Sequence, residues 1–455
     1  MLKRQAEDRL VTWFNSSRRK PLVLRGARQV GKSTLIESFS RKSGMNLLTV
    51  NCEKNRQLDS VFETLDVVRI LNEVEATANK GAINSQSLLF LDEIQATPNA
   101  LPALRYLYEE RSDLAVIAAG SLLEFALSEH QFSMPVGRIQ YLHMGPLSFR
   151  EFVQAVEPER IAYLDELNPD SSMPEAAHRS LCALQRNYLF TGGMPEAVAV
   201  YQATGSLSEV RNVHKEIVET YVDDFAKYAR NKDLALLQRI FSSIPRLLGQ
   251  KIKYVNLVDG ERAAHVRALI ELLIKAQVVL PIWHSHCSGI PLGANIDASV
   301  FKLAFLDVGL ANHLCGVDWQ YLANSENLRL VNEGGIAEQH VAQQLAWLGD
   351  GKPELTYWHN ESRSSTAEVD FTHAFGMDIY PIEVKAGKSG SLKSLQQFML
   401  KKGSGRAIRF DLNQASRQMM DQRARTKEGS ENISYELISL PLYAVEELPR
   451  IVNCC

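Results

Sequence analysis

The segment at residues 26–33 has the residue types and the spacing that bind the phosphates of a nucleotide. It reads GARQVGKS, which fits GxxxxGK[ST], and it lies between a short apolar run and an amphipathic helical pattern. Backbone N–H groups of such a loop, with the positive end of the following helix, surround phosphate groups. We expect Lys32 to contact the β- and γ-phosphates of ATP and Ser33 to ligate Mg²⁺; the alternative is a glycine turn followed by a surface lysine. The predicted nucleotide-binding residues of this loop are Gly26, Ala27, Arg28, Gln29, Val30, Gly31, Lys32, Ser33 and Thr34.

A pair of acids follows the apolar run at residues 88–91. The sequence LLFLDE predicts a buried strand that ends at Asp92 and Glu93, and ligands of open α/β sheets bind at the carboxyl ends of the strands. We expect Asp92 to hold the Mg²⁺ shell and Glu93 to orient and activate the attacking water. An apolar run followed by two acids is common, but its position behind a phosphate-binding loop favours a functional pair.

Two further residues are open to two interpretations each. Ser121 follows the apolar run at residues 114–119, where a polar sensor of the γ-phosphate or of the water would lie, but it would equally serve as a helix N-cap. Arg138 follows a loop and would act as an arginine finger supplied to a second copy of the chain, which implies a homo-oligomer. The alternative for Arg138 is a surface ion pair.

The C-terminal third holds a second group of charged side chains, Glu338, Asp370, Glu383 and Lys385. Glu338 shares a helical face with apolar residues at i+3, i+4 and i+7, and a carboxylate that faces a core needs a partner or a metal. Glu383 and Lys385 lie on one face of a predicted strand. A glycine-containing turn at residues 373–378 would pair this strand with the one that carries Asp370.

This second group predicts a metal site. Asp370 and Glu383 would hold Mg²⁺ through hard oxygen ligands, and Lys385 would position a water or stabilise transition-state charge. The pattern is similar to the PD-(D/E)xK nuclease core, with Glu338 as the glutamate on the preceding helix. The alternative is an exposed salt bridge between Lys385 and either acid of the paired strands.

The elements that would position these groups alternate along the chain. Residues 1–20 predict a leading amphipathic helix, and four short apolar runs interleaved with helical patterns predict a parallel sheet covered on both faces. From residue 149 to about residue 288 the pattern is mainly helical, and a second α/β pattern begins after residue 301. The four apolar runs lie at residues 21–25, 47–50, 88–91 and 114–119.

Six motifs together resemble one protein family. LRGARQVGKSTL, LFLDEIQ, AAGSLLEF, PVGRI, GPLSFREF and TGGMPEAV follow one another in this order. The chain resembles prokaryotic AAA-type ATPases, of the archaeal-ATPase/STAND-like kind, that carry a C-terminal domain of unknown function (number 4143), and the resemblance spans nearly the whole chain. It implies an AAA core followed by a helical lid, and it implies that Gly193 and Pro195 belong to the lid element that approaches the base and ribose.

These observations predict an α/β protein in four parts. They are a P-loop AAA-type parallel-sheet ATPase core at residues 1–150, a helical lid at 151–215, a helical or winged-helix-like region at 216–300, and a C-terminal α/β nuclease-like (restriction-endonuclease-like) domain at 301–455.

Composition excludes several classes of protein. Hydrophobic residues make up 45% and charged residues 23% of the chain, as in ordinary globular proteins, and the net charge of −3 names no partner. His284, His286 and Cys287 are close in sequence, but no second ligand pair lies near them, so we do not expect them to bind metal. The chain has no run of about 18 apolar residues and no signal-peptide core, so we expect no membrane span and a cytoplasmic location.

Local charge points to a polyanion. Residues 385–427 contain eleven basic residues and two acidic ones, an asymmetry that favours DNA as a partner; the alternative is a solvated face balanced by acids elsewhere. Two functions therefore remain open. One is an ATP-dependent enzyme that acts on DNA through the nuclease-like domain, and the other is a nucleotide-driven switch or sensor whose nuclease-like domain is inactive and binds a partner.

Overall fold

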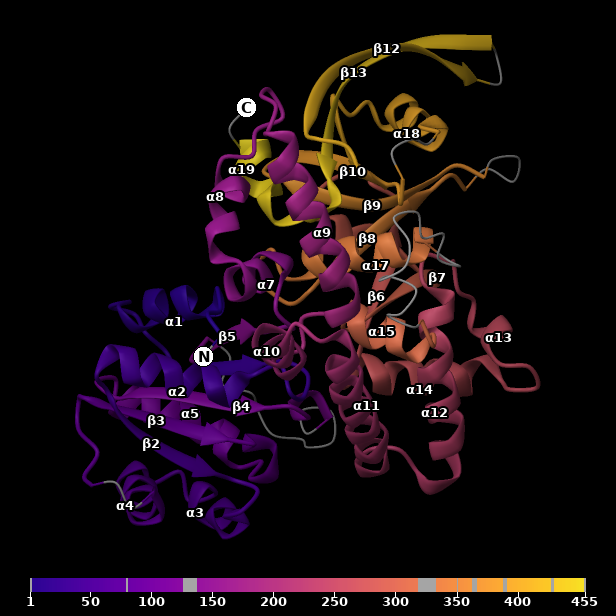
Figure 1. The fold of residues 1–455 in the computed structure, drawn as a ribbon. Coiled ribbons are helices and arrows are strands. Elements are labelled where there is room, and N and C mark those ends of the chain that lie inside the picture. Colours follow the sequence, from indigo (N-terminus) through magenta and orange to yellow (C-terminus); the bar gives the residue numbers. More distant parts are fainter. Residues whose placement is uncertain are drawn as a thin grey trace. The chain divides into compact units, whose positions relative to one another are not determined.

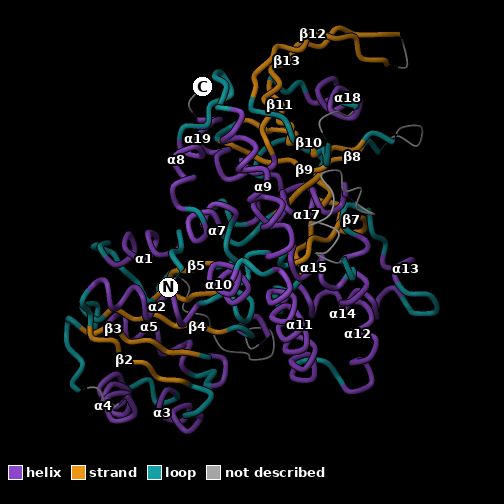
Figure 2. The backbone as a smooth tube through the Cα atoms, viewed as in Figure 1, coloured by secondary structure: helices purple, strands orange, loops and turns teal. Residues whose placement is uncertain are grey.

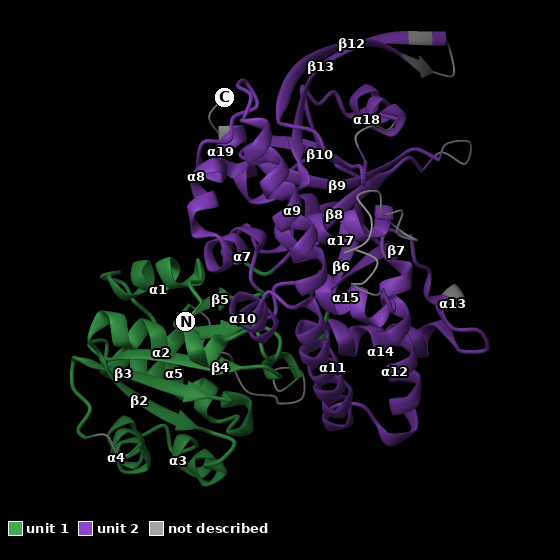
Figure 3. Ribbon diagram, in the orientation of Figure 1, with its two compact units in different colours: residues 1–146, 275–278, 350–352 green, residues 147–274, 279–349, 353–455 purple. Residues whose placement is uncertain are grey.

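The computed structural model describes residues 2–78, 81–125, 137–317, 333–349, 351–361, 366–387, 391–426 and 429–453. The chain forms two compact units (Figure 3). The first comprises residues 1–146, 275–278 and 350–352, and the second comprises residues 147–274, 279–349 and 353–455. Lys388, Lys427, Cys454 and Cys455 lie outside the described residues.

The first unit is built on a five-stranded parallel sheet with the order β2-β3-β4-β1-β5 (Figures 1 and 2). Its strands are β1 (Leu22–Arg25), β2 (Asn46–Asn51), β3 (Ser87–Asp92), β4 (Ala115–Gly120) and β5 (Gln140–His143). Its helices include α1 (Ala6–Phe14), α2 (Lys32–Ser43), α3 (Asp59–Phe62), α4 (Val67–Ala78) and α5 (Ala100–Glu110). The four apolar runs of the sequence are strands, as predicted, whereas β5 gave no apolar run because only two of its four residues are buried.

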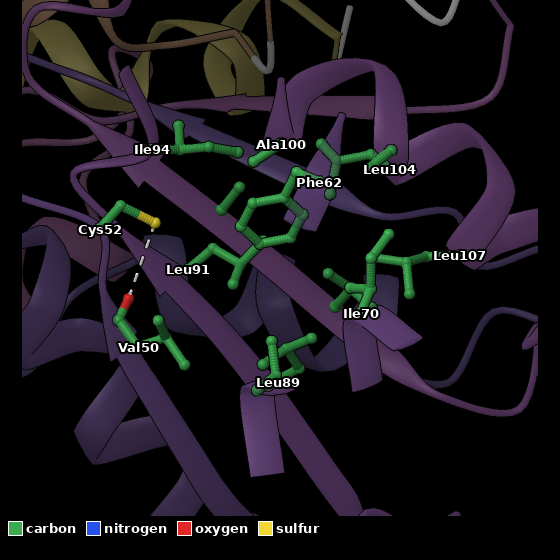
Figure 4. Close-up of a cluster of buried hydrophobic side chains, with 14 of the residues drawn as sticks. Val50, Cys52, Phe62, Ile70, Leu89, Leu91, Ile94, Ala100, Leu104 and Leu107 are labelled. Atoms are coloured by element: carbon green, nitrogen blue, oxygen red, sulfur yellow. Dashed lines mark hydrogen bonds between the residues drawn. The ribbon is translucent and has the colours of Figure 1, made fainter. Parts of the chain in front are cut away.

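The core of this unit explains why its strands are continuously apolar. Every residue of β4, and every residue of β3 except Asp92, is buried, because helices cover both faces of the sheet. Figure 4 shows Leu89 and Leu91 of β3 together with Phe62, Ile70 and other helical side chains in one cluster. The sheet order places β4 between β1 and β3, so the residues that follow these three strands lie at one edge of the sheet.

The second unit begins with helices and continues into an eight-stranded mixed sheet. The helices up to residue 275 are α7 (Phe149–Val156), α8 (Ile161–Asp165), α9 (Glu175–Thr191), α10 (Pro195–Thr204), α11 (Leu207–Asp224), α12 (Leu234–Ser243), α13 (Tyr254–Leu257) and α14 (Ala263–Lys275). The later ones include α15 (Val308–Leu314), α17 (Glu333–Ala346), α18 (Lys393–Lys402) and α19 (Leu448–Asn453).

The sheet of the second unit has the order β12-β13-β11-β10-β9-β8-β6-β7 (Figure 1). Its strands are β6 (Val279–Ser285), β7 (Ile296–Phe305), β8 (Leu355–His359), β9 (Glu368–Phe375), β10 (Asp378–Val384), β11 (Arg406–Asp411), β12 (Ser416–Thr426) and β13 (Gly429–Pro441). β9 and β10 pair antiparallel, as the turn at residues 373–378 predicts. Residue 300 falls inside β7, so strands on both sides of that position belong to one sheet.

Residues 147–152 of the motif GPLSFREF pack against α9 and against the motif TGGMPEAV inside the second unit. Ser148 caps α7 in a reciprocal capping box with Glu151, and the ring of Phe149 meets that of Tyr188 edge to face, with centroids 5.7 Å apart. The Leu147 amide donates to the Gly193 carbonyl oxygen at 2.6 Å. These motifs therefore fix how the first helices of this unit pack.

Within the described ranges, none of the helices combines the length and apolarity that a bilayer crossing requires.

We predict that one buried histidine makes the second unit sensitive to acid. Burial lowers the pKa of His340 to about 4, and its Nε2 donates to the Leu442 carbonyl oxygen at 3.0 Å. An unfolded histidine takes up a proton near pH 6.5, so the stability contributed by neutral His340 is complete above that pH and is lost as the pH falls from 6.5 to about 4, at about 1.4 kcal/mol per pH unit.

Urea unfolding followed between pH 7 and pH 4.5 checks this. His340→Gln keeps a donor for Leu442 but cannot be protonated, so its free energy of unfolding should fall less steeply with acid than that of the wild type. Parallel pH profiles for the two proteins would show that His340 does not titrate on unfolding.

Candidate functional site

The loop between β1 and α2 has the backbone of a phosphate-binding loop. Gln29 and Gly31 both have left-handed backbones, with φ of 61° and 92°, and they turn the chain into the N-terminus of α2. A Cβ on Gly26 would lie 2.3 Å from the Met144 carbonyl oxygen, so only glycine fits there. The first amides of the 12-residue helix α2 are therefore directed at the loop, which is the geometry that binds phosphate. Thr34 is exposed on the first turn of this helix.

Lys32 is held inside this loop. Its ammonium donates to the carbonyl oxygens of Gly26 at 2.9 Å and Ala27 at 2.7 Å. Burial lowers the pKa of Lys32 to about 8, although the carboxylates of Glu93 and Asp92 act in the opposite direction. The Lys32 side chain is thus still a cation at neutral pH. It donates to two carbonyl oxygens, and phosphate oxygens could replace these acceptors.

Arg4 supports the loop from the N-terminal segment. Its guanidinium donates to the Val30 carbonyl oxygen at 2.8 Å and to the Gly145 carbonyl oxygen at 2.7 Å. These bonds tie the loop to the chain segment that follows β5. Sequence analysis gave Arg4 no role, because nothing in the local pattern MLKRQ shows what it contacts.

Ser33 and Asp92 meet as a Mg²⁺ site would require. The Ser33 hydroxyl donates to Asp92 Oδ2 at 3.2 Å. Burial and then the neighbouring Glu93 carboxylate raise the pKa of Asp92, and a cation at this position would relieve both effects. A hydroxyl and a carboxylate oxygen are hard ligands of the kind Mg²⁺ takes, so the residues present fit the ion.

Glu93 and Ser121 lie together at the ends of adjacent strands. The Ser121 hydroxyl donates to Glu93 Oε2 at 3.4 Å, and the Gln95 side-chain amide donates to the same oxygen at 2.5 Å. Glu93 itself has a left-handed backbone with φ of 52° and follows directly after the last residue of β3. The role of Ser121 as a sensor of the γ-phosphate or of the water stays a prediction.

Arg138 forms a surface ion pair. Its Nε donates to Glu109 Oε1 at 2.8 Å, and its side chain is 46% exposed. This matches the second interpretation of the residue, and the contact lies within the first unit. A role as an arginine finger toward another copy of the chain stays a prediction.

In the second unit a buried lysine joins the predicted acids. Lys302 on β7 is fully buried, and its ammonium lies 3.1 Å from Glu338 Oε2, 2.6 Å from Glu368 Oε1 and 4.0 Å from Asp370 Oδ1. Lys251 pairs with the other oxygen of Glu368 at 2.9 Å. The cluster thus unites α17, β7 and β9, which lie far apart in the sequence.

The remaining predicted residues complete this cluster. Lys385 forms an ion pair with Glu383, and Asp370 Oδ2 accepts a hydrogen bond from the Val384 amide at 2.7 Å. Among the described residues, the buried Glu383 Oε2 has no hydrogen-bond partner. The structure therefore brings together Glu338, Asp370, Glu383 and Lys385, the four residues that sequence analysis selected.

The charges of the cluster nearly balance without any bound ion. Burial and then Asp370 raise the pKa of Glu338 to about 8, and the same two causes raise the pKa of Glu383 to about 7. Burial alone would lower the pKa of Lys302, but the surrounding carboxylates outweigh it and raise that pKa above its usual value. Four carboxyl groups face three lysines, so one proton held among the carboxyl groups makes the cluster neutral.

The donor set fits Mg²⁺ only in part. Its oxygens are hard carboxylate ligands, and Glu383 Oε2 is available. However, the Lys302 ammonium already binds two of the acids and lies near Asp370. The domain therefore supplies a cation of its own where the nuclease pattern predicts a metal.

Comparison with known proteins assigns the parts of the chain to families. Residues 18–153 match the family model of an AAA domain. The first unit contains an AAA-type ATPase core. Residues 183–321 match the domain of unknown function DUF8612, and residues 333–434 match the domain of unknown function DUF4143. The AAA and DUF4143 parts of the predicted resemblance are confirmed. The predicted division of the chain into four parts stays a prediction, and the DUF8612 match spans its boundary at residue 215.

Three solved structures are similar to this chain at low identity. A Walker-type ATPase of Pyrococcus abyssi has 17% identity and a TM-score of 0.44, with 69% of this chain and 96% of that chain covered. The ORC1 protein of Aeropyrum pernix in complex with DNA has 14% identity and a TM-score of 0.29, with 70% and 93% covered. The ORC2 protein of Aeropyrum pernix in ADPNP–ADP complexes has 13% identity and a TM-score of 0.28, with 70% and 95% covered. No curated protein matched the sequence.

The predicted lid residues Gly193 and Pro195 belong to the second unit. The Gly193 amide donates to the buried Asp307 carboxylate at 2.6 Å, and Pro195 begins α10. Gly193 thus has partners within its own unit, and contact of Gly193 or Pro195 with a nucleotide stays a prediction.

Sequence analysis missed Lys302 and Glu368 as parts of the acidic cluster. Lys302 is the one charged residue in the apolar stretch SVFKLAF, and a lone lysine inside a buried strand must find acidic partners. That signal was present in the sequence, whereas the identity of the partners depends on how β7 lies beside α17 and β9.

We predict that Lys302 acts as the internal cation of this cluster. Lys302→Met removes the ammonium that pairs with the buried Glu338 and with Glu368 and should lower the free energy of unfolding by about 3–5 kcal/mol. Millimolar Mg²⁺ should restore part of that loss in the variant and should not change the wild type. Urea unfolding with and without Mg²⁺ measures both effects.

Lys393→Met, at an exposed position on α18 of the same unit, is the matched control and should change stability by less than about 0.5 kcal/mol. A Lys302→Met protein as stable as this control would contradict the assignment.

Proposed function

We propose that the chain binds MgATP in its AAA core and hydrolyses it, with Glu93 as the group that orients and activates the water. Two side-chain hydrogen bonds carry this proposal: Ser33 donates to Asp92, and Ser121 donates to Glu93. A hydroxyl and a carboxylate for the ion, and a carboxylate with a serine for the water, are the parts that phosphoryl transfer to water needs.

The steps follow from the chain's own groups. The Lys32 ammonium would exchange the carbonyl oxygens of Gly26 and Ala27 for β- and γ-phosphate oxygens, and the α2 amides would bind the phosphates. Mg²⁺ bound by Ser33 and Asp92 would supply charge neutralisation at the β- and γ-phosphates. Glu93 would accept the proton of the attacking water, and Ser121 would hold the carboxylate in place.

The second half of the proposal concerns DNA. We propose that nucleotide turnover acts on the C-terminal domain, which binds DNA through exposed basic side chains. Several basic residues of the predicted stretch are paired with acids, among them Arg406 and Arg417 with Glu436 and Arg409 with Asp411. Lys393 and Arg423 are exposed, so the positive charge open to a phosphate backbone is smaller than the sequence count suggests.

A cleft beside the acidic cluster adds to this basic surface. It has a volume of about 500 Å³, and its lining includes Lys251, Lys253 and His359. Lys251 belongs to both the cleft and the cluster, because it pairs with Glu368. A polyanion bound in this cleft would lie next to the nuclease-like residues.

Lys302 favours a second candidate function. An ammonium that neutralises Glu338, Glu368 and Asp370 leaves less need for a catalytic metal. In this alternative the chain is a nucleotide-driven switch whose nuclease-like domain binds a partner without cutting DNA.

The first experiment tests hydrolysis. Glu93→Gln keeps the shape of the side chain but removes the base, so it should retain ATP binding and lower turnover by about 100-fold or more. Phosphate release and nucleotide binding are measured on the same samples. Glu110→Gln, an exposed position at the end of α5, is the matched control and should turn over like the wild type.

If Glu93→Gln hydrolyses ATP at the wild-type rate, Glu93 is not the base.

The second experiment separates the enzyme from the switch. We expect DNA to raise ATP turnover several-fold. We also expect plasmid nicking in Mg²⁺ to be no greater for the wild type than for Asp370→Ala, because Lys302 neutralises the cluster. The double variant Lys393→Gln/Arg423→Gln should lower the slope of log affinity against log salt by about 2.

Nicking that Asp370→Ala abolishes would establish an active nuclease and remove the switch. ATP turnover that is unchanged by single-stranded, duplex and supercoiled DNA would remove DNA as the partner.

A further inference from the structure

Two histidines and a glutamate meet at one end of the second sheet. His284 lies in β6, His286 follows it, and Glu361 follows β8. β6 and β8 are parallel neighbours with His284 opposite Tyr357, so the segments that leave the two strands run side by side. The ligand atoms of the three side chains all lie within 4.8 Å of one another.

Both imidazoles point at the same carboxylate oxygen. His284 Nε2 lies 3.2 Å from Glu361 Oε1, and His286 Nδ1 contacts that same oxygen. Two nitrogens and one oxygen that converge in this way are the donor set of first-row metals such as Zn²⁺. In a tetrahedral site with bonds of about 2.0–2.1 Å, ligand atoms stand about 3.3 Å apart, so small rotations of the exposed side chains suffice.

The surroundings hold the donors in place. The His284 ring is only 1% exposed and stacks on His359, with centroids 3.9 Å apart. The His286 amide donates to the Asn295 carbonyl oxygen at 3.1 Å, and the Asn360 amide donates to the Ala367 carbonyl oxygen at 2.9 Å. Hydrogen bonds therefore fix the backbone at His286 and next to Glu361.

Charge and access also suit a divalent cation. Asp297 lies opposite His284 in the β6–β7 register, and its carboxylate adds a negative charge near the two histidines. The side chains of His286 and Glu361 are 41% and 56% exposed, so a fourth position would face solvent. Cys287 does not take part, because its thiol is buried and bonds to the Ser285 carbonyl oxygen.

We propose that His284, His286 and Glu361 bind one Zn²⁺ ion, which links the segments that follow β6 and β8 and leaves one coordination position open to water. We did not expect metal here from the sequence, because no second ligand pair lies near the histidines. The third ligand, Glu361, stands 75 residues after His286 and reaches the site through the pairing of β6 with β8.

Metal titration of the full chain tests this proposal. Cys454 and Cys455 are adjacent thiols that could bind Zn²⁺ themselves, so every protein carries C454S and C455S. After EDTA treatment and desalting, Zn²⁺ is titrated by calorimetry and Co²⁺ by its visible absorption, without nucleotide. We expect one ion per chain and a rise in unfolding temperature with Zn²⁺.

His286→Ala and Glu361→Gln change exposed side chains, and each should weaken Zn²⁺ binding by at least about tenfold and abolish the thermal shift. His265→Ala is the matched control, because His265 also contacts two acids in this unit, Asp233 and Glu261, but has no second histidine; it should bind like the parent. No bound Zn²⁺ in the parent, or equal affinity in all four proteins, would overturn the site.

Discussion

The AAA core depends on how a short turn of backbone and one ammonium neutralise a triphosphate. The turn is possible because Gly26 packs against the Met144 carbonyl and Gly31 takes a left-handed conformation. The parallel sheet then brings the ends of β3 and β4 beside this loop, and with them Asp92, Glu93 and Ser121. Every other part of the proposed ATPase chemistry relies on this juxtaposition, since an ion ligand or a water-activating carboxylate has no use without a bound phosphate.

The second unit relies on buried charge that is compensated internally. Lys302 and its acids join α17 to β7 and β9. Asp307, at the start of α15, accepts hydrogen bonds from the Gly193 amide and from the Gln343 side chain on α17. Breaking such pairs costs more than the pairs contribute, because the remaining charge stays buried. In the proposed nuclease-like domain, such a cluster would hold its carboxylates in place without a metal, so the cutting and the non-cutting functions would use the same arrangement of side chains.

Much of this could be predicted from the sequence. Residues 26–33 and 88–93 combine a local motif with an adjoining apolar strand, and each lies at the end of a strand, as the sequence predicts. The antiparallel pairing of the strands that carry Asp370 and Glu383 also follows from the alternation of apolar and polar residues and from a glycine turn. What could not be predicted depends on contacts between distant segments. Arg4 at the loop, Lys302 among the acids and Glu361 beside two histidines all come from tertiary packing, and the charge count at residues 385–427 did not reveal that Arg406, Arg409 and Arg417 have acidic partners.

Calorimetric titration of ATP into the purified chain measures whether the loop at residues 26–33 binds a triphosphate. We expect saturable binding at one site in Mg²⁺, with affinity greatly reduced in Lys32→Ala, because that variant removes the ammonium from the loop. Absence of measurable binding of any purine triphosphate to the wild type in Mg²⁺, or equal affinity in Lys32→Ala, would contradict it.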